Sequence, residues 1–398
     1  MLDATVAVVT YNHAPYIADC LRSLLALDPL PSALVVVDNG SRDGTAAIVK
    51  RDFPAVKLIE AGANLGFAGG CNLAVRSTES ELIVLANPDL VVRPDWLAAL
   101  CQPLQTRPGV GVTGGKLLYR DGVRIQHAGG MLLLPLALGT HRGVGQEDRG
   151  QFDAMEPVEY VTGAALACRR SLWEALDGLD QQFFPAYYEE VDFCTRARQA
   201  GHTVLYTPRA VGTHVEGASV GHGSSRYLRL FHLNRLRYLF KHFTNTWLMR
   251  EWLPAELGHL RAVADTVEVD ALECVYLAYQ SAFCYNESQP VVSDLDTFPD
   301  ATATGGETEL QWVARQAAAK ATLRPEPIRS RWPALAWLRN KLAGLATTEY
   351  LRPIIQQQTD ANLAMAEAVA ALVRQRRAAE AAALLQGMLL AKIWGAQK

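Results

Sequence analysis

The fold of this chain is decided by residues 5–38, TVAVVTYNHAPYIADCLRSLLALDPLPSALVVVD. Residues 6–9 and 34–37 are apolar at every position, which is typical of strands that are buried on both faces. Between them, Pro15 begins a segment with apolar residues at helical spacing: Ile17, Leu21, Leu24 and Leu25. A strand, a helix and a second strand predict a parallel sheet with right-handed crossovers.

The alternation continues further along the chain. Residues 56–59 and 82–85 read as two more buried strands, and residues 160–168 as a fifth. The chain is therefore predicted to be an α/β protein with a mostly parallel central sheet. Ligands of such sheets bind beyond the carboxyl ends of the strands, so the polar residues that follow each strand are the candidates for a site.

Composition narrows the class of protein. The 398 residues suffice for two to three domains, and a net charge of −3 argues against a nucleic-acid binder. Seven scattered cysteines without a Cys-x-x-Cys pair predict reduced thiols in the cytoplasm and argue against a zinc site. No signal peptide is evident, and the apolar run at 131–138 is too short to span a bilayer. We expect a soluble or peripheral protein.

The first strands end in polar residues without a dinucleotide fingerprint. Strand one is followed by Thr10 and Asn12 and not by Gly-x-Gly-x-x-Gly, which disfavours a nicotinamide or flavin site. Strand two ends at Asp38 and Asn39, where a carboxylate could accept hydrogen bonds from a pyrimidine or a ribose. A simple turn at Asn39-Gly40 is the alternative.

The next two strands lead to a glycine-rich stretch and a short acidic turn. Residues 64–72, NLGFAGGCN, permit close backbone approach, and Asn64 offers an amide. Strand four is followed by Asn87-Pro88-Asp89. Mg²⁺ and Mn²⁺ prefer oxygen ligands, often one or two carboxylates together with substrate phosphates, and Asp89 suits that role. A plain turn is the alternative.

Three carboxylates crowd into one predicted helix start, at Glu189, Glu190 and Asp192. The free N–H groups and the dipole of a first helical turn tolerate such negative charge. Arg196 lies four residues after Asp192 and could pair with it. A capped surface helix explains the pattern as well as a site does, so the rest of the chain must decide.

The ordered set of motifs resembles the GT-A glycosyltransferases of family 2, especially the bacterial branch with rhamnosyltransferases and galactofuranosyltransferases. The resemblance covers about residues 4–250. It rests on VVTYN at 8–12, VVDNGS at 36–41, NLGFAGGCN at 64–72, NPD at 87–89, TGAA at 162–165, YEEVDFCTR at 188–196 and HVEGAS at 214–219. Each motif is common alone, whereas the ordered set is specific.

The resemblance implies a nucleotide-sugar donor, with a dTDP or UDP nucleotide, and a divalent cation, Mg²⁺ or Mn²⁺. The nucleoside would be held by Thr10, Asn12, Asp38 and Asn39, with Asn64 close to it. Asn87 and Asp89 stand where the family carries its Asp-x-Asp motif, so Asp89 is the firmer metal ligand. His214 would complete the metal site. Other histidines, among them His13 and His127, are interpreted as ordinary hydrogen-bonded residues.

The resemblance also implies inverting transfer, in which a carboxylate deprotonates the acceptor hydroxyl. The family's base falls on Glu190, where many relatives carry Asp. Glu189 or Asp192 would then contact sugar or acceptor hydroxyls. The metal would neutralise charge on the departing diphosphate.

A basic and aromatic segment follows His214. No acidic residue occurs in the range 217–250, and the next one is Glu251. One interpretation is an ordinary helix with a solvated basic face. The other is a helix that lies on an anionic membrane surface, where Arg226, Arg229 and Arg235 contact the diphosphate of a polyprenyl-linked acceptor, and Arg237 adds to the basic face.

These observations predict three parts and one activity. The parts are a catalytic domain at 1–225, divided at about residue 95 into donor and acceptor halves, the basic and aromatic segment at 226–262, and a helical extension at 263–398 with a flexible loop at 286–307. We expect a cytoplasmic enzyme, or one at the inner face of the cytoplasmic membrane, that transfers rhamnose from dTDP-rhamnose to a cell-surface or lipid-linked glycan. The alternatives are a UDP-dependent galactofuranosyl or hexosyl transferase and a degenerate scaffold. A weak heptad seam at 363–373 suggests self-association.

Overall fold

The computed structural model describes residues 1–215, 224–264, 266–284, 371, 375–389 and 392. The chain divides into two compact units: the described residues up to Glu256 form the first, and those from Leu257 onward form the second. Residues 226–256 therefore belong to the first unit, whereas the sequence predicted a separate segment from 226. The predicted loop at 286–307 and the heptad seam at 363–373 lie outside the described residues, apart from residue 371.

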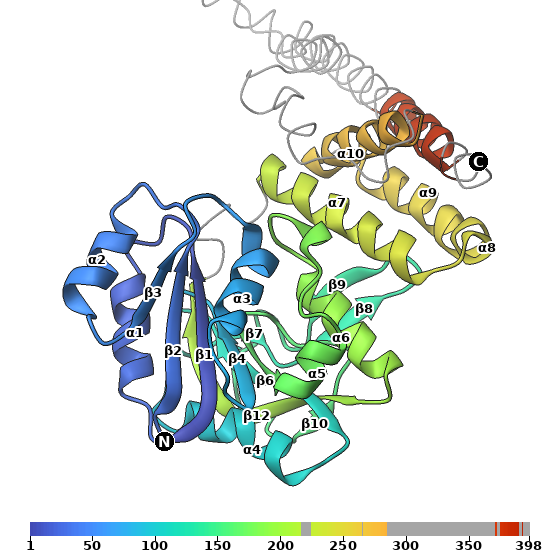
Figure 1. The fold of residues 1–398 in the computed structure, drawn as a ribbon. Coiled ribbons are helices and arrows are strands. Elements are labelled where there is room, and N and C mark those ends of the chain that lie inside the picture. Colours follow the sequence, from blue (N-terminus) through green and yellow to red (C-terminus); the bar gives the residue numbers. More distant parts are fainter. Residues whose placement is uncertain (216–223, 265, 285–370, 372–374, 390–391, 393–398) are drawn as a thin grey trace, which may run out of the picture. The chain divides into compact units, whose positions relative to one another are not determined.

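A mixed sheet forms the centre of the first unit (Figure 1). Its strands follow the spatial order β10 (Glu156–Pro157), β12 (Thr203–His214), β6 (Val110–Leu118), β11 (Ala165–Arg169), β4 (Leu82–Ala86), β1 (Leu2–Thr10), β2 (Pro31–Asp38) and β3 (Lys57–Glu60). Two short strands lie outside this order: β5 (Leu90–Val92) pairs with β12, and β7 (Ile125–His127) pairs with β6.

The predicted parallel arrangement is correct for the first four strands. β4, β1, β2 and β3 are parallel neighbours, and Thr10 lies opposite Asp38 in register. β11 is antiparallel to both β4 and β6, so the sheet as a whole is mixed. A buried apolar run has the same local pattern in either direction, which is why the sequence could not predict this reversal.

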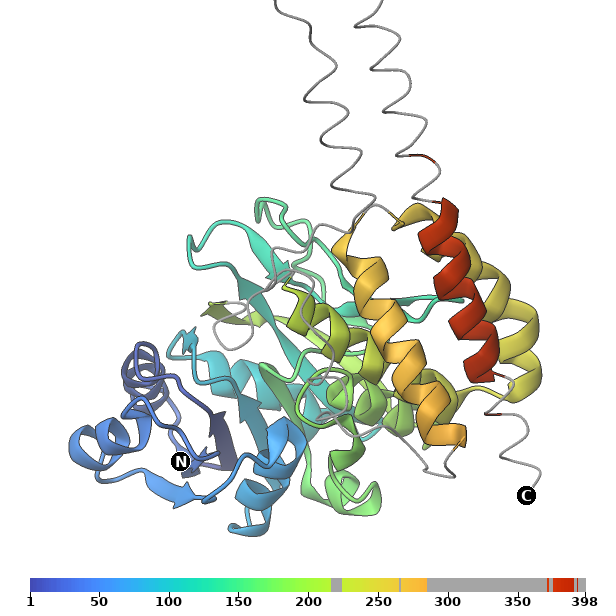
Figure 2. The ribbon, with the colours of Figure 1, turned by 90° about the horizontal axis from the view of Figure 1, so that it is seen from above.

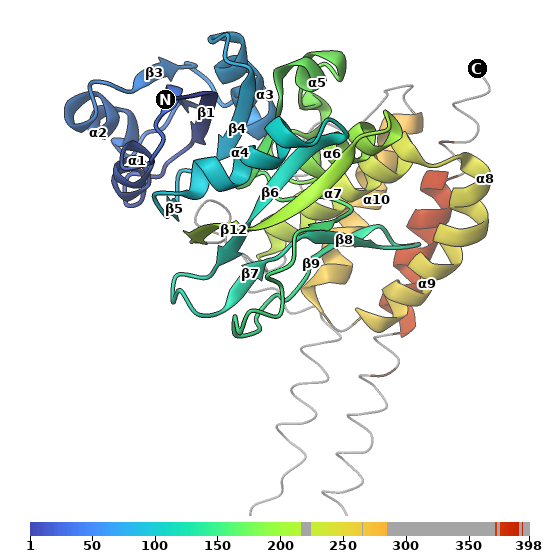
Figure 3. The same cartoon turned by 90° about the horizontal axis from the view of Figure 1, so that it is seen from below.

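Helices cover both faces of the parallel part. α1 (Ile17–Leu25) and α2 (Thr45–Asp52) lie on one face and α3 (Gly66–Arg76) on the other (Figures 1 and 3). α4 (Trp96–Thr106) shares a buried cluster with α1, in which Leu21 and Trp96 pack against strand residues such as Val84. This core fixes the carboxyl edge of β1, β2 and β4.

The second half of the first unit packs around β6 and β12. Its helices are α5 (Arg170–Ala175), the 3₁₀ turn η1 (Gln181–Phe183), α6 (Glu189–Gln199), α7 (Ser225–His242), α8 (Asn245–Trp247) and the π-helical η2 (Leu248–Trp252). A separate hairpin is formed by β8 (Gly130–Leu133) and β9 (Leu138–His141) (Figure 3). α6 begins at Glu189, and Gly201 follows its end with a φ of +86°, a left-handed conformation that is typical of glycine after a helix.

The second unit is helical where the structure describes it. α9 (Leu253–Ala262) runs across the division, and α10 (Val267–Cys284) lies beside a helix at 375–389 (Figure 2). An ion pair between Arg377 and Asp270 joins these two helices. None of the helices in the described part of the chain combines the length and the apolar character needed to cross a membrane.

Candidate active site

A cavity of about 660 Å³ opens at the carboxyl edge of the sheet in the first unit. Its wall brings together predicted site residues from distant parts of the sequence: Thr10, Asn39, Asn64, Asn87, Asp89, Glu189, Glu190, His214 and Arg226. The parallel strands explain this convergence, because their carboxyl ends meet at one edge.

The end of β2 presents two buried oxygen atoms without a hydrogen-bond donor. Asp38 Oδ2 accepts from the backbone N–H groups of Gly40 and Ser41, at 3.2 and 3.0 Å, whereas its Oδ1 has no hydrogen bond. Asn39 donates from Nδ2 to the carbonyl of Gly66 at 3.0 Å, and its Oδ1 is also without a hydrogen bond. A buried acceptor without a donor is costly. Asn39 lines the cavity, so its open oxygen fits a ligand that brings N–H or O–H groups, whereas Asp38 is not among the residues that line it.

Asn12 has a different place from the one predicted. It does not line the cavity. Its side-chain oxygen accepts from the backbone N–H of Arg42 at 2.8 Å, and its own N–H donates to Ser41 Oγ at 2.9 Å. Asn12 therefore shapes the loop that follows Asp38 at the end of β2.

Asp89 and His214 lie together because β5 and the end of β12 pair in antiparallel register, with His214 opposite Leu90. His214 Nε2 is 3.1 Å from Asp89 Oδ1 and 3.0 Å from Asn87 Nδ2. Asp89 Oδ1 is buried, and the angles at this distance do not make a hydrogen bond with the imidazole. On the opposite side of the ring, Nδ1 lies 2.7 Å from Oε1 of Gln126, a residue that no sequence motif marked.

This pair fits a hard divalent cation. A carboxylate oxygen and an imidazole nitrogen are acceptable donors for Mg²⁺ or Mn²⁺, which complete their shell with water and phosphate oxygens. Among the described residues, no group of three or more His, Cys, Asp or Glu side chains is placed to hold a metal. The protein part of such a site is thus Asp89 and His214, with Asn87 beside them.

The acidic start of α6 places two carboxylates at the cavity. Glu189 is 4% exposed and Glu190 is half-buried, and each has one buried oxygen without a hydrogen bond. Burial raises the pKa of Glu190 to about 7, although backbone N–H groups at the helix start oppose the shift. Burial, and next the charge of Glu190, raise the pKa of Glu189 well above its usual range.

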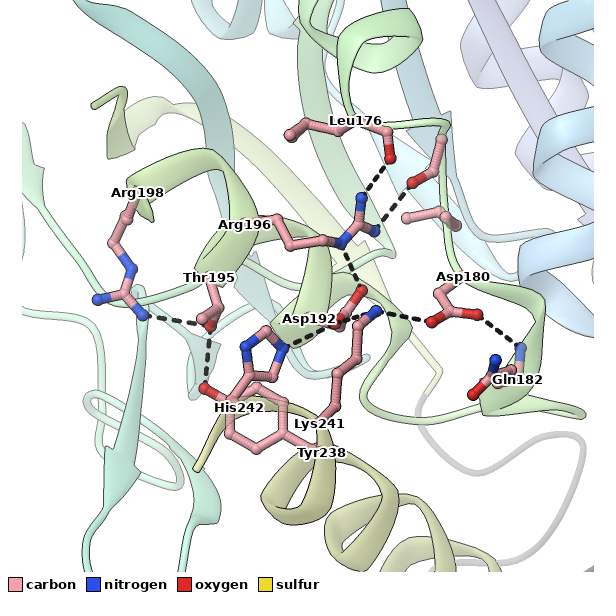
Figure 4. Close-up of polar contacts among 12 residues, drawn as sticks. Leu176, Asp180, Gln182, Asp192, Thr195, Arg196, Arg198, Tyr238, Lys241 and His242 are labelled. Atoms are coloured by element: carbon pink, nitrogen blue, oxygen red, sulfur yellow. Dashed lines mark hydrogen bonds and ion pairs between the residues drawn. The ribbon is translucent and has the colours of Figure 1, made fainter. Parts of the chain in front are cut away.

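Asp192 belongs to a structural cluster (Figure 4), and it does not line the cavity. Its carboxylate pairs with Arg196 at 2.7 Å, Lys241 at 2.7 Å and His242 at 2.8 Å. Burial tends to raise the pKa of Asp192, but the His242 hydrogen bond and the charges of Arg196 and Lys241 lower it below its usual range. The pairing with Arg196 is present, and these contacts leave no place for Asp192 as a sugar or acceptor contact.

The arginines of α7 do not form the basic face that the sequence suggested. Arg226 is exposed and lines the cavity, whereas Arg229 is buried and does not line it. Arg235 is fully buried against Glu256, and Arg237 donates to the carbonyl of Phe184 and to Asn234. Three of these four cations are therefore unavailable to lipid headgroups, and the membrane-surface interpretation of α7 is corrected.

Several residues of the cavity were missed because no motif marks them. His13, interpreted as ordinary, lines the cavity, and its Nδ1 accepts from the backbone N–H of Tyr11 at 3.2 Å. Burial lowers the pKa of His13. His127 lines the cavity as well and is fully buried. Both residues line the cavity because segments far apart in the sequence meet there in the folded chain.

An aromatic wall faces the carboxylates of α6. Tyr187 meets Tyr227 edge to face with ring centroids 5.2 Å apart, and Tyr227 stacks on Phe231 at 5.9 Å. All three line the cavity, together with Tyr160. Flat aromatic faces with nearby polar groups are typical of sites that hold a largely apolar or amphipathic ligand.

Comparison with known proteins agrees with this arrangement. The sequence model of Glycosyl transferase family 2 matches residues 5–176. Protein y4gI of Sinorhizobium fredii is 31% identical over 232 residues, which are 55% of this chain and 25% of y4gI. The N-acetylglucosaminyl-diphospho-decaprenol L-rhamnosyltransferase of Mycobacterium tuberculosis is 27% identical over 265 residues, 61% of this chain and 85% of that protein.

A similar solved structure is a mannosyltransferase from Pyrobaculum calidifontis in complex with GDP-Man and Mn²⁺. It is 18% identical, with a TM-score of 0.44, over 92% of this chain and 86% of that one. This chain thus covers 25% of y4gI, 85% of the rhamnosyltransferase and 86% of the mannosyltransferase. The sequence match alone carries the comparison: residues 5–176 match the model of glycosyl transferase family 2, and the resemblance stated from the sequence is confirmed.

Proposed function

We propose that this protein transfers a sugar from a nucleotide-sugar donor to a hydroxyl group of a glycan, with inversion at the sugar carbon. One observation carries the proposal: Glu190, with a pKa of about 7, lines the same cavity as Asp89, His214 and Asn39. A base whose pKa lies near neutrality can both accept and release a proton at physiological pH.

The donor side of the cavity would be the edge formed by β1, β2 and β4. The open oxygens of Asp38 and Asn39 would accept hydrogen bonds from the nucleoside, and Thr10 and Asn64 would line its pocket. Asp89 and His214 would hold Mg²⁺ or Mn²⁺. When bound, the cation supplies charge neutralisation for the departing diphosphate.

The residues of α6 would act on the acceptor. Glu190 takes the proton of the attacking hydroxyl, on the side of the sugar opposite to the departing diphosphate. Glu189 is too deeply buried to be a second base, and burial raises its pKa well above its usual range, so it would support Glu190 as a neighbour that favours the neutral form. Its proximity to Glu190 also disfavours two negative charges in one place.

The acceptor would be a lipid-linked or cell-surface glycan, and the sugar rhamnose from dTDP-rhamnose. Support comes from the name of the mycobacterial relative, which is a rhamnosyltransferase that acts on a diphospho-decaprenol. The aromatic wall of Tyr187, Tyr227 and Phe231 would stack on the acceptor, and Arg226 would pair with its phosphate groups. UDP-hexoses remain the alternative donors, and the same assay tests them.

The test is a donor screen with the purified chain. dTDP-rhamnose, UDP-galactofuranose, UDP-glucose and UDP-N-acetylglucosamine are each incubated with a diphospho-lipid N-acetylglucosamine acceptor, with Mn²⁺ or with chelator. We expect transfer from dTDP-rhamnose that chelator abolishes. Glu190→Gln should lower the rate by about 10²–10⁴-fold, as expected for loss of a general base. Absence of transfer and of hydrolysis with every donor would favour the scaffold interpretation.

A further inference from the structure

Gln126 contacts His214 on the ring edge opposite to Asp89. It lies on β7, which pairs with β6, and its side chain is 3% exposed. Its amide oxygen is 2.7 Å from His214 Nδ1, a short distance for a hydrogen bond to nitrogen.

The chemistry of the two amides around His214 fixes the tautomer that this geometry favours. An amide oxygen can only accept, so His214 must carry its proton on Nδ1 to bond with Gln126. On the other edge, Asn87 presents its N–H group to Nε2 at 3.0 Å, which requires a lone pair at Nε2. Both contacts, made by residues far apart in the sequence, indicate the same neutral tautomer.

This tautomer directs an electron pair toward a carboxylate. Nε2 and Asp89 Oδ1 would both be acceptors, although only 3.1 Å separates them. Two acceptors at this distance repel each other unless a proton or a cation lies between them. A cation at this place resolves the repulsion, since histidine ligands of metals commonly donate their other N–H to an oxygen acceptor.

We infer that Gln126 is a positioning residue that holds His214 with Nδ1 protonated and Nε2 directed at Asp89, ready for a cation. The inference rests on the proposed function for the cation itself, but not for the orientation of the ring. Gln126 also contacts another residue that lines the cavity: its backbone carbonyl lies 3.2 Å from Nδ1 of His141 on β9.

The orientation is tested by NMR on ¹⁵N-histidine-labelled full-length protein at about pH 8.5, where an ordinary imidazole is neutral. The His214 signal is assigned by its disappearance in His214→Asn. We expect a protonated Nδ1 in the wild type and a changed tautomer balance in Gln126→Leu. Gln126→Glu keeps an acceptor oxygen at the same length and should retain the wild-type tautomer. A wild-type His214 protonated on Nε2 overturns the inference, whether or not the Gln126 variants fold.

The consequence for the metal is measured separately, as Mn²⁺ affinity by electron paramagnetic resonance. Gln126→Leu should bind Mn²⁺ about 10–100-fold more weakly, the usual effect of removing such a partner. Gln126→Glu should stay within a few-fold of the wild type. Ile125→Val, a buried change on the same strand, is the control and should leave the affinity unchanged.

The two hypotheses fail in different ways. If the wild type shows protonated Nδ1 but binds no Mn²⁺, the metal part of the proposed function fails and the orienting role of Gln126 stands. If Mn²⁺ binds equally well to the wild type and to a folded Gln126→Leu, the positioning role is overturned and the proposed function stands.

Discussion

At the scale of single residues, the burial of Glu190 sets the pH at which the proposed chemistry can run. Its pKa of about 7 means that the carboxyl group is protonated, and unable to accept a proton, at lower pH. We therefore expect the transfer rate to rise about tenfold per pH unit below about pH 7 and to level off above it. The rate is measured at saturating donor, acceptor and Mn²⁺. A wild-type rate that does not vary between about pH 5.5 and 8 would contradict the assignment of Glu190 as the base.

The second carboxyl group of the cavity, that of Glu189, should affect how the stability of the protein depends on pH. The folded protein holds a proton on Glu189 to higher pH than the unfolded chain does, because burial raises its folded pKa. The free energy of unfolding should then fall as pH rises above the unfolded value of about 4.5. Glu189→Gln removes this loss, so it should be more stable than the wild type at about pH 8 and lose the advantage near pH 4.

Urea denaturation across pH measures this difference. Glu174→Gln is the control, because the Glu174 side chain is 64% exposed, and it should not alter the pH dependence. A Glu189→Gln variant less stable than the wild type at pH 8 would show that the carboxylate form is stabilised instead.

At the residue level, several of the positions that a motif marked lie close together in the folded chain. Asp89, Glu190 and His214 come together in one cavity, as the ordered motifs implied. Gln126 could not be found, since its contact with His214 spans 88 residues and a lone glutamine has no signature. For Asp192 the motif was misleading. Its position in the motif suggested a ligand contact, but its carboxylate pairs with Lys241 and His242, 49 and 50 residues further along the chain.

At the scale of elements, α7 was misread because arginine is ordinarily a surface residue. Arg235 is fully buried and makes two hydrogen bonds to Glu256, and a third to the carbonyl of Leu136 in the β8–β9 turn. Trp252 donates to the same carboxylate at 3.1 Å. A stripe of arginines on a helix predicts a solvated face only when no buried acidic residue pairs with it. Here Glu256, 21 residues after Arg235, is buried and pairs with that arginine.

This buried pair should matter for stability far more than the exposed pairs. Glu256→Gln leaves the Arg235 charge buried without its carboxylate, so it should lower the free energy of unfolding by about 3–5 kcal/mol. Asp19→Asn breaks the exposed pair with Arg22, whose side chains are 65% and 70% exposed, and should cost no more than about 1 kcal/mol. Urea denaturation of both variants decides the matter: equal losses would show that the buried pair is not a structural anchor of α7.

At the scale of the whole molecule, the sheet explains how one cavity could take both proposed substrates. The parallel strands β4, β1 and β2 form the edge proposed to bind the donor, and the antiparallel β11 separates them from β6 and β12. β6 pairs with β7, which carries Gln126, and β12 ends at His214. The apolar runs predicted the parallel part of this edge. The reversal at β11, and with it the meeting of Asp89 with His214, depends on long-range pairing that no local pattern encodes.

If nucleotide and cation share this edge, their binding should be coupled and should stabilise the fold. A ligand that binds only the folded state, at a hundred times its Kd, adds about 2.7 kcal/mol to the free energy of unfolding. We expect Mn²⁺ with UDP or dTDP to raise the melting temperature more than the two additions do separately, and EDTA to reverse the gain. Asp89→Asn should lose the coupled part, whereas Asp95→Asn, an exposed change at the start of α4, should keep it. Additive shifts in the wild type would show that nucleotide and cation do not meet, and would remove the basis for placing both at the Asp89 end of the cavity.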